Sequence, residues 1–172
     1  MSYNFKNKKI VISAGASGIG WATAKECLEK GAKVFLCDVD KKYISKLKKH
    51  PLNNKRLFSF VCDASNESEV SNFFKEVRKK TQKIDALINN VGIAGPTGTL
   101  EKLKTKDWEK TLKVNVISHF VFSKLAIPML KKNKGGSVIN LSSTAGIYGS
   151  VSYTHLRAHE TSLHLVCRLL LE

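Results

Sequence analysis

Glycines and small polar residues gather near the start of the chain, in the segment Ser13-Ala14-Gly15-Ala16-Ser17-Gly18-Ile19-Gly20. An apolar run at 9–12, typical of a buried strand, precedes this segment, and residues 21–30 after it have helical spacing. A strand, a glycine-rich turn and a helix in this order form a phosphate cradle, because glycines let the backbone approach a pyrophosphate and the helix N-terminus presents free N–H groups. We therefore expect dinucleotide binding, with cofactor contacts from Ser13, Gly15, Ser17, Gly18, Ile19 and Gly20.

A carboxylate follows each of the next two apolar runs. Asp38 comes after the run at 33–37 and lies 18 residues beyond Gly20. An aspartate at this place can accept hydrogen bonds from both ribose hydroxyls of an adenosine and repels a 2′-phosphate, so NAD is favoured over NADP. The alternative is an aspartate that only shapes the turn before Val39. Asp63 and its neighbour Ala64 are further cofactor candidates, and Asp63 either binds the adenine amino group or caps the next helix.

Strand and helix patterns alternate along the chain from residue 8 onward. We expect strands at 8–13, 33–37, 57–62, 86–88 and 136–141, and helices at about 19–30, 41–49, 65–80, 105–116 and 120–130, with a hydroxyl cap at Ser65. Apolar strands without alternation, separated by helices, predict an α/β fold with a doubly wound parallel sheet, the Rossmann fold. Right-handed crossovers place all carboxyl ends of the strands on one edge, where ligands bind.

Together these motifs resemble the short-chain dehydrogenase/reductase family over about residues 6–149. The family's Thr-Gly-x-x-x-Gly-x-Gly turn is matched by 13–20, although Ala14 replaces its first glycine. Its Asn-Asn-Ala-Gly motif is matched by 89–92, which adds Asn90, Val91 and Gly92 to the expected cofactor contacts. Its helix asparagine corresponds to Asn115 and its serine after strand five to Ser143.

The resemblance implies an NAD(P)-dependent oxidoreductase that interconverts a secondary alcohol and a ketone, with a small-molecule substrate and a homotetramer for the parent protein. It implies that Ser143 binds the substrate oxygen and that Asn115 holds a water in a proton relay. The alternatives are a strand-end hydroxyl that caps a turn for Ser143, and an amide that satisfies backbone at a helix bend for Asn115. In the family, a tyrosine exchanges the hydroxyl proton, and a lysine four residues later lowers the tyrosine pKa.

No Tyr-x-x-x-Lys occurs after Ser143. The nearest approach is Tyr153 with Arg157, where the tyrosine comes about three residues early and a planar, bulkier cation replaces lysine. We therefore expect this chain to be a truncated, inactive fragment of such an enzyme. A non-catalytic NAD-binding module is the alternative.

The last 22 residues differ from the rest in composition. Residues 151–172 hold no lysine and three of the five histidines, and 151–160 resembles the translation of a transposase-type sequencing adapter. We interpret 1–150 as an incomplete dinucleotide-binding domain, truncated after strand five, and 151–172 as an artefactual tail. His155 and His159 have the i, i+4 spacing of metal ligands but lack a third ligand nearby, so no metal site is expected.

The formal net charge of +15 raises the question of nucleic-acid binding. The lysines are spread over nearly every expected helix and no nucleic-acid motif accompanies them, so we expect no specific nucleic-acid partner. No apolar run reaches 18 residues, which predicts no membrane span. The first residues lack a signal-peptide core and the four cysteines form no CxxC pair, so we expect reduced thiols and a cytoplasmic location.

Overall fold

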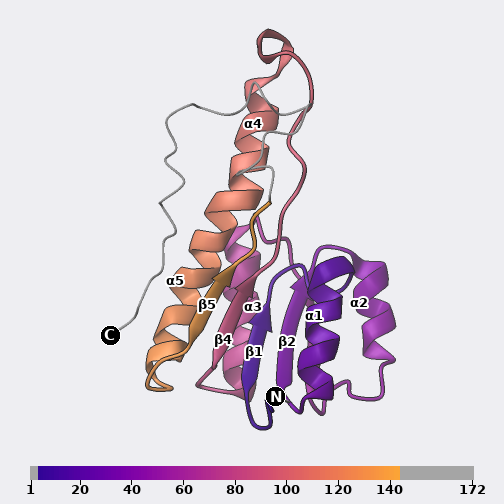
Figure 1. Ribbon diagram of the computed structural model, residues 1–172, viewed down its shortest axis with the longest axis vertical. Helices are drawn as coiled ribbons and strands as arrows, with labels where there is room; N and C mark the ends of the chain where they lie inside the picture. Colours follow the sequence, from indigo (N-terminus) through magenta and orange to yellow (C-terminus); the bar gives the residue numbers. More distant parts are fainter. Residues whose placement is uncertain (1–3, 144–172) are drawn as a thin grey trace.

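The computed structural model describes residues 4–143, which form one α/β unit (Figure 1). In chain order its elements are β1 (Lys9–Ile12), α1 (Gly18–Glu29), β2 (Lys33–Asp38), α2 (Lys41–Lys48), β3 (Leu57–Val61), α3 (Glu67–Lys80), β4 (Ala86–Asn89), the 3-10 turn η1 (Leu100–Lys102), α4 (Thr105–Leu112), the π-helical segment η2 (Lys113–Ile117), α5 (Ser118–Lys131) and β5 (Ser137–Asn140). Every strand and helix expected from the sequence is present, with ends shifted by a few residues at most. The turn η1 was not predicted.

The five strands form one parallel sheet in the order β3-β2-β1-β4-β5. Ile12 of β1 pairs with Leu36 on one side and Ile88 on the other. The strand order therefore reverses between β1 and β4, which is the switch point where ligands bind in open α/β sheets. The doubly wound Rossmann architecture is confirmed for the described residues.

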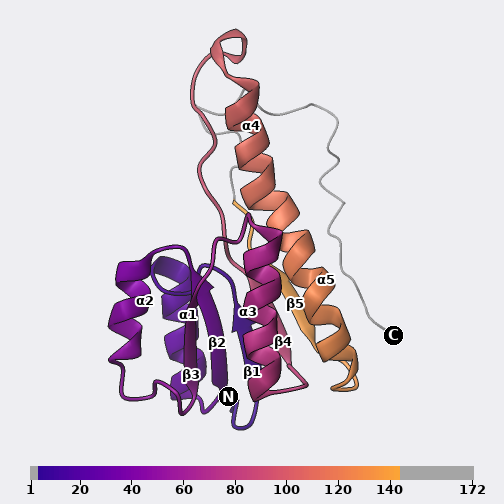
Figure 2. The same cartoon turned by 180° about the vertical axis from the view of Figure 1, so that it is seen from behind.

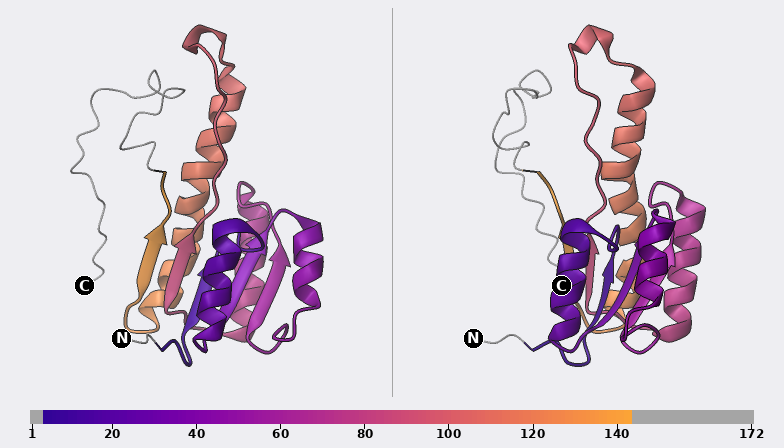
Figure 3. Two further views of the ribbon diagram at one scale, coloured as in Figure 1. Left: turned by 45° about the vertical axis from the view of Figure 1, so that its right-hand side comes forward. Right: turned by 90° about the vertical axis from the view of Figure 1, so that its right-hand side faces the viewer.

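Helices cover both faces of this sheet (Figure 3). The helices α1 and α2 pack on one face over a cluster that includes Ile12, Leu28 and Leu36, while α3 and α5 pack on the other over a cluster that includes Phe74 and Phe122. Neighbouring strand residues therefore point into different cores and are both buried. This explains why the strand sequences are apolar without alternation.

One long helical stretch extends beyond the carboxyl edge of the sheet (Figure 2). It consists of α4, the wider π turn η2 and α5, and α5 contains Pro128 in its last turns. A single π turn inside an α-helix inserts one residue and often marks a functional position. The two expected helical segments, 105–116 and 120–130, are joined by this π turn, and Asn115 lies at its centre.

The start of α3 corrects one expectation. Asn66, not Ser65, is the N-cap, and its Oδ1 accepts hydrogen bonds from the Ser68 and Glu69 amides. The Ser65 amide and hydroxyl both donate to Asp63 Oδ1, at 2.8 Å each. Because Asp63 folds these residues into a turn, the chain enters the helix one residue later than the serine pattern indicates.

The strand β5 lies at one edge of the described sheet, and its residues are half-buried or exposed, with Ile139 at 47% exposure. Within residues 4–143, no strand pairs with the outer edge of β5. Within the same range, no helix is both long enough and apolar enough to cross a membrane.

Candidate functional site

A cavity of about 570 Å³ lies at the carboxyl edge of the sheet, within the size range of small-molecule sites. It brings together seven of the residues expected to bind a cofactor: Ser17, Asp38, Asp63, Ala64, Asn90, Val91 and Gly92. These residues come from the glycine-rich turn and from the ends of β2, β3 and β4. Their convergence follows from the parallel sheet, because all carboxyl ends share one edge.

The glycine-rich turn is closely packed at Gly20 and has free space around Gly18. A Cβ on Gly20 would lie 2.3 Å from the Ala14 carbonyl oxygen, so no other residue fits there. Gly18 has a φ of +51°, and no atom lies within 4 Å of the place where its Cβ would be. The turn therefore leaves room for a ligand at Gly18, where the N-terminus of α1 presents its amides.

Five residues of the expected set lie outside the lining of this cavity: Ser13, Gly15, Gly18, Ile19 and Gly20. Ser13 is fully buried, and its Oγ accepts hydrogen bonds from the Asn90 and Val91 amides at 3.0 and 3.1 Å. The Asn90 side chain in turn donates to the Ser13 and Ala14 carbonyls. The turn after β1 and the loop after β4 are thus locked together, which positions both for a ligand.

Asp38 fulfils its turn-forming role while it faces the cavity. Its carboxylate is 8% exposed and accepts hydrogen bonds from the Ala16 amide and the Asp40 amide, both at 3.0 Å. Each carboxylate oxygen retains a second lone pair, so a ribose hydroxyl can still donate to it. Asp63 also lines the cavity, and it shapes the entry to α3 through Ser65 without capping the helix itself.

Asn115 makes both of its side-chain hydrogen bonds in the structure to one residue of the loop after β4. Its Oδ1 accepts from the Ile93 amide at 2.8 Å, and its Nδ2 donates to the Ile93 carbonyl at 2.9 Å. Its side chain therefore satisfies backbone at the helix bend, and the relay role stays a prediction. Ser143 is exposed and is the last described residue, while Tyr153 and Arg157 lie outside the described residues.

Several lining residues were not expected from the sequence: Ala14, Val39, Cys62, Ser65, Ile93, Lys110, Lys113 and Val114. Lys110 and Val114 are four residues apart and therefore lie on the same face of a helix, a relation that could have been recognised from the sequence. The Cys37 thiol, which precedes Asp38 in β2, is a poor nucleophile. Burial raises the pKa of Cys37 well above its ordinary value, and the neighbouring Cys62 raises it further, so this thiol stays protonated.

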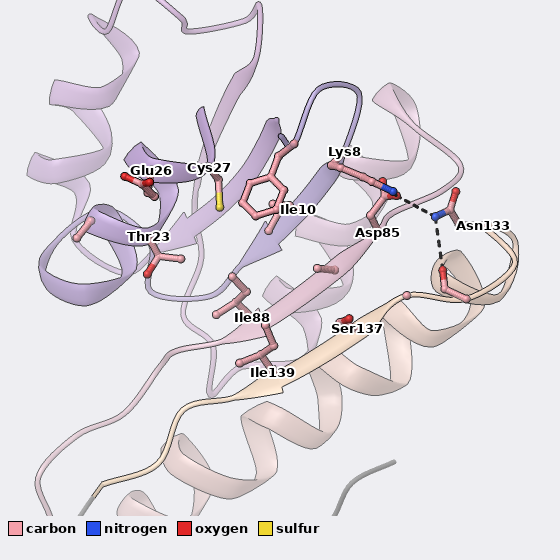
Figure 4. A pocket seen from close by; sticks show the side chains of 15 residues that line it. Lys8, Ile10, Thr23, Glu26, Cys27, Asp85, Ile88, Asn133, Ser137 and Ile139 are labelled. Carbon is pink, nitrogen blue, oxygen red and sulfur yellow. Dashed lines mark hydrogen bonds and ion pairs between the residues drawn. The ribbon is translucent and has the colours of Figure 1, made fainter. Parts of the chain in front are cut away.

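A second cavity, of about 900 Å³, lies between α1 and the strands β1, β4 and β5 (Figure 4). Isoleucines line it along the strands, and an ion pair between Lys8 and Asp85 closes one end. Burial raises the pKa of Asp85, but hydrogen bonds from the Lys9 amide, Lys8 and Asn133 outweigh it and lower the pKa overall. This cavity lacks the glycine-rich turn and the polar strand ends, so its lining contains none of the residues expected to bind a cofactor.

Residues 8–159 match the family described as short chain dehydrogenase. The chain belongs to this family. The chain is similar to a 3-oxoacyl-(acyl-carrier-protein) reductase FabG of Thermotoga maritima, with 29% identity over 92% of this chain and 64% of the relative. An uncharacterized oxidoreductase of the same organism is 34% identical over 85% of this chain and 57% of the relative.

Solved structures share the fold of this chain. Levodione reductase superposes with a TM-score of 0.80 at 26% identity, over 88% of this chain and 60% of the reductase. The chain thus spans about three fifths of the length of these relatives. The family match extends past β5 to residue 159, and the boundary expected at residue 150 stays a prediction.

Proposed function

We propose that this chain is the nucleotide-binding part of an NAD-dependent oxidoreductase that interconverts secondary alcohols and ketones. The observation that supports it best is the cavity that joins Ser17, Asp38 and Gly92 at the switch point of the sheet. Family membership and the reductases among its relatives agree with this proposal.

The residues present fit a nicotinamide dinucleotide. The open space at Gly18 and the adjacent N-terminus of α1 suit a pyrophosphate, and Lys110 and Lys113 add positive charge to the lining. The Asp38 carboxylate is placed to bind the adenosine ribose. When bound, the dinucleotide supplies or takes up the hydride, and the protein binds and orients it.

A preference for NAD over NADP follows from the charge at the end of β2. Asp38 is almost fully buried, so its negative charge is poorly screened by water. A 2′-phosphate placed on the same ribose would face this carboxylate at short range. The preference is therefore electrostatic, and it depends on Asp38 rather than on the shape of the cavity.

Calorimetric titration of the full chain with NADH and NADPH tests this proposal. We expect NADH to bind at least about tenfold more tightly than NADPH, and Asp38→Asn to narrow that ratio. Asp40→Asn is the matched control, because Asp40 caps α2 and asparagine caps equally well. Tighter binding of NADPH would overturn the cofactor preference, and no binding of either nucleotide would overturn the proposed function.

The proposed roles at the reacting end belong to Ser143 and Asn115. We propose that Ser143 binds the substrate oxygen and that Asn115 acts by holding the loop at Ile93. Because no Tyr-x-x-x-Lys follows Ser143 in this sequence, we expect the chain to show no turnover of secondary alcohols. Turnover that Tyr153→Phe abolishes would contradict this expectation.

The absence of that pair from the sequence also favours a second candidate, a nucleotide-binding module without catalysis. Both candidates predict NADH binding, so the state of the protein in solution separates them. A monodisperse chain with a well-dispersed NMR spectrum favours the module. Aggregation through the open edge of β5 favours a fragment of a larger enzyme.

A further inference from the structure

The loop after β4 is held by side chains from two directions. Ser13 Oγ accepts from the Val91 amide on the side of β1, and His119 Nε2 lies 2.9 Å from the Val91 carbonyl oxygen on the side of α5. Both polar groups of Val91 are therefore fixed. His119 also contacts β4 itself, because its carbonyl oxygen lies 3.5 Å from Asn89 Nδ2.

The contact with Val91 decides which imidazole nitrogen carries the proton. A carbonyl oxygen only accepts, so His119 must donate from Nε2. His119 and Asn115 are four residues apart along the helix, and they hold alternate residues of the loop, Val91 and Ile93. The helix thus positions the loop through two side chains.

The direction of the Val91 carbonyl also determines the direction of the Gly92 N–H. The Val91 carbonyl and the Gly92 amide belong to one planar trans peptide, so they point in opposite directions. With the carbonyl directed at His119, the Gly92 N–H points away from α5. Gly92 lines the nucleotide cavity, and around the place of its missing Cβ the nearest atom is Asn115 Oδ1 at 3.7 Å.

We propose that His119 is a positioning residue for the nucleotide: it orients the Val91–Gly92 peptide so that the Gly92 N–H donates to an oxygen of the bound dinucleotide. This inference rests on the proposed function. It concerns a residue outside the cavity lining, which acts through the backbone and touches no reacting atom.

Substitutions at His119 separate this role from a general effect on folding. A glutamine side chain carries its Nε2 the same number of bonds from Cα as histidine does, whereas the amide nitrogen of asparagine is one bond closer. The variants are therefore His119→Gln and His119→Asn, with His119→Ala as the full deletion. Phe120→Ala is the control, because the adjacent phenylalanine is 62% exposed. Each variant is checked for cooperative thermal unfolding before titration.

The readouts are the NADH dissociation constant and, without nucleotide, the carbonyl ¹³C shift of Val91 and the amide shift of Gly92. We expect His119→Ala and His119→Asn to weaken NADH binding about three- to tenfold, as for the loss of one hydrogen bond, and His119→Gln to stay within about twofold of the parent chain. Phe120→Ala should bind like the parent. The Val91 carbonyl shift should move in the alanine and asparagine variants and return in the glutamine variant.

The outcomes separate the role of His119 from the proposed function. Equal NADH affinity in all His119 variants, or an unchanged Val91 carbonyl shift, overturns the role of His119 and leaves the proposed function intact. A parent chain that binds no NADH overturns the proposed function, and the shifts of the nucleotide-free protein still test the His119–Val91 bond. If His119→Ala does not fold, the difference in NADH affinity and in Val91 carbonyl shift between His119→Gln and His119→Asn decides whether His119 has this role.

Discussion

Replacing Ala14 with glycine should stabilise the chain, although it removes a methyl group. Ala14 has a φ of +48°, in the left-handed region, where an L-residue is disfavoured by about 1–2 kcal/mol. Glycine removes this strain but adds freedom to the unfolded chain, which costs about 0.4–1 kcal/mol. The net gain, taken at the middle of both ranges, is about 0.8 kcal/mol. For a chain of this size it raises the melting temperature by about 1–4 °C.

Thermal unfolding followed by circular dichroism measures this effect, with Ala16→Gly as the matched control. Ala16 is buried in the same turn and does not have a positive φ, so glycine there should cost about 1 kcal/mol. The two variants change the unfolded chain equally, and their difference reports the native conformation of residue 14. A melting temperature for Ala14→Gly that falls as far as that of Ala16→Gly would refute the strain at Ala14.

Three further predictions concern folding. Gly20→Ala should lose about 1–3 kcal/mol in urea unfolding, because its Cβ would meet the Ala14 carbonyl at 2.3 Å. Ser13→Ala should lose about 2 kcal/mol or more and weaken NADH binding, because two amides of the loop after β4 lose their acceptor. Asp85 has a lowered pKa in the folded chain, so its stabilisation is present above about pH 4 and disappears as the pH falls through the folded value. Asp85→Asn should therefore flatten the acid limb of a stability curve.

Each of these three has a contradicting result. Gly20→Ala with unchanged stability would mean that the turn is looser than the structure shows. Ser13→Ala with unchanged NADH affinity would separate the turn from the nucleotide site. An acid limb as steep in Asp85→Asn as in the parent chain would mean that the contacts of this carboxylate do not survive in solution.

The parts of the fold that depend on local pattern were predictable from the sequence. Unalternated apolar runs such as 33–37 are buried on both faces, and this follows directly from a parallel sheet between two helical layers. Polar residues that end such runs, for example Asp38 and Asn90, lie at one edge of the sheet because the carboxyl ends of parallel strands share that edge. The glycine-rich turn between a strand and a helix was also recognisable, since glycine alone allows the close approach seen at Gly20.

The features that could not be predicted from the sequence depend on which side chain bonds to which backbone group. Ser65 was expected to cap α3, but Asp63 takes both its amide and its hydroxyl, and Asn66 becomes the cap. The structure adds a contact that the pattern did not predict for Ser13, which is buried and holds the loop after β4, while its expected cofactor contact stays a prediction. His119 carries no motif at all, and only the path of the loop across α5 shows its contact with Val91.

The most direct test of the nucleotide site is an amide shift map of the full chain titrated with NADH. We predict that the largest shift changes fall on Ser17, Asp38 and Gly92, which surround the cavity at the carboxyl edge. Changes centred instead on Ile10 and Ile88, in the second cavity, or none at millimolar NADH, would contradict a nucleotide site at this edge.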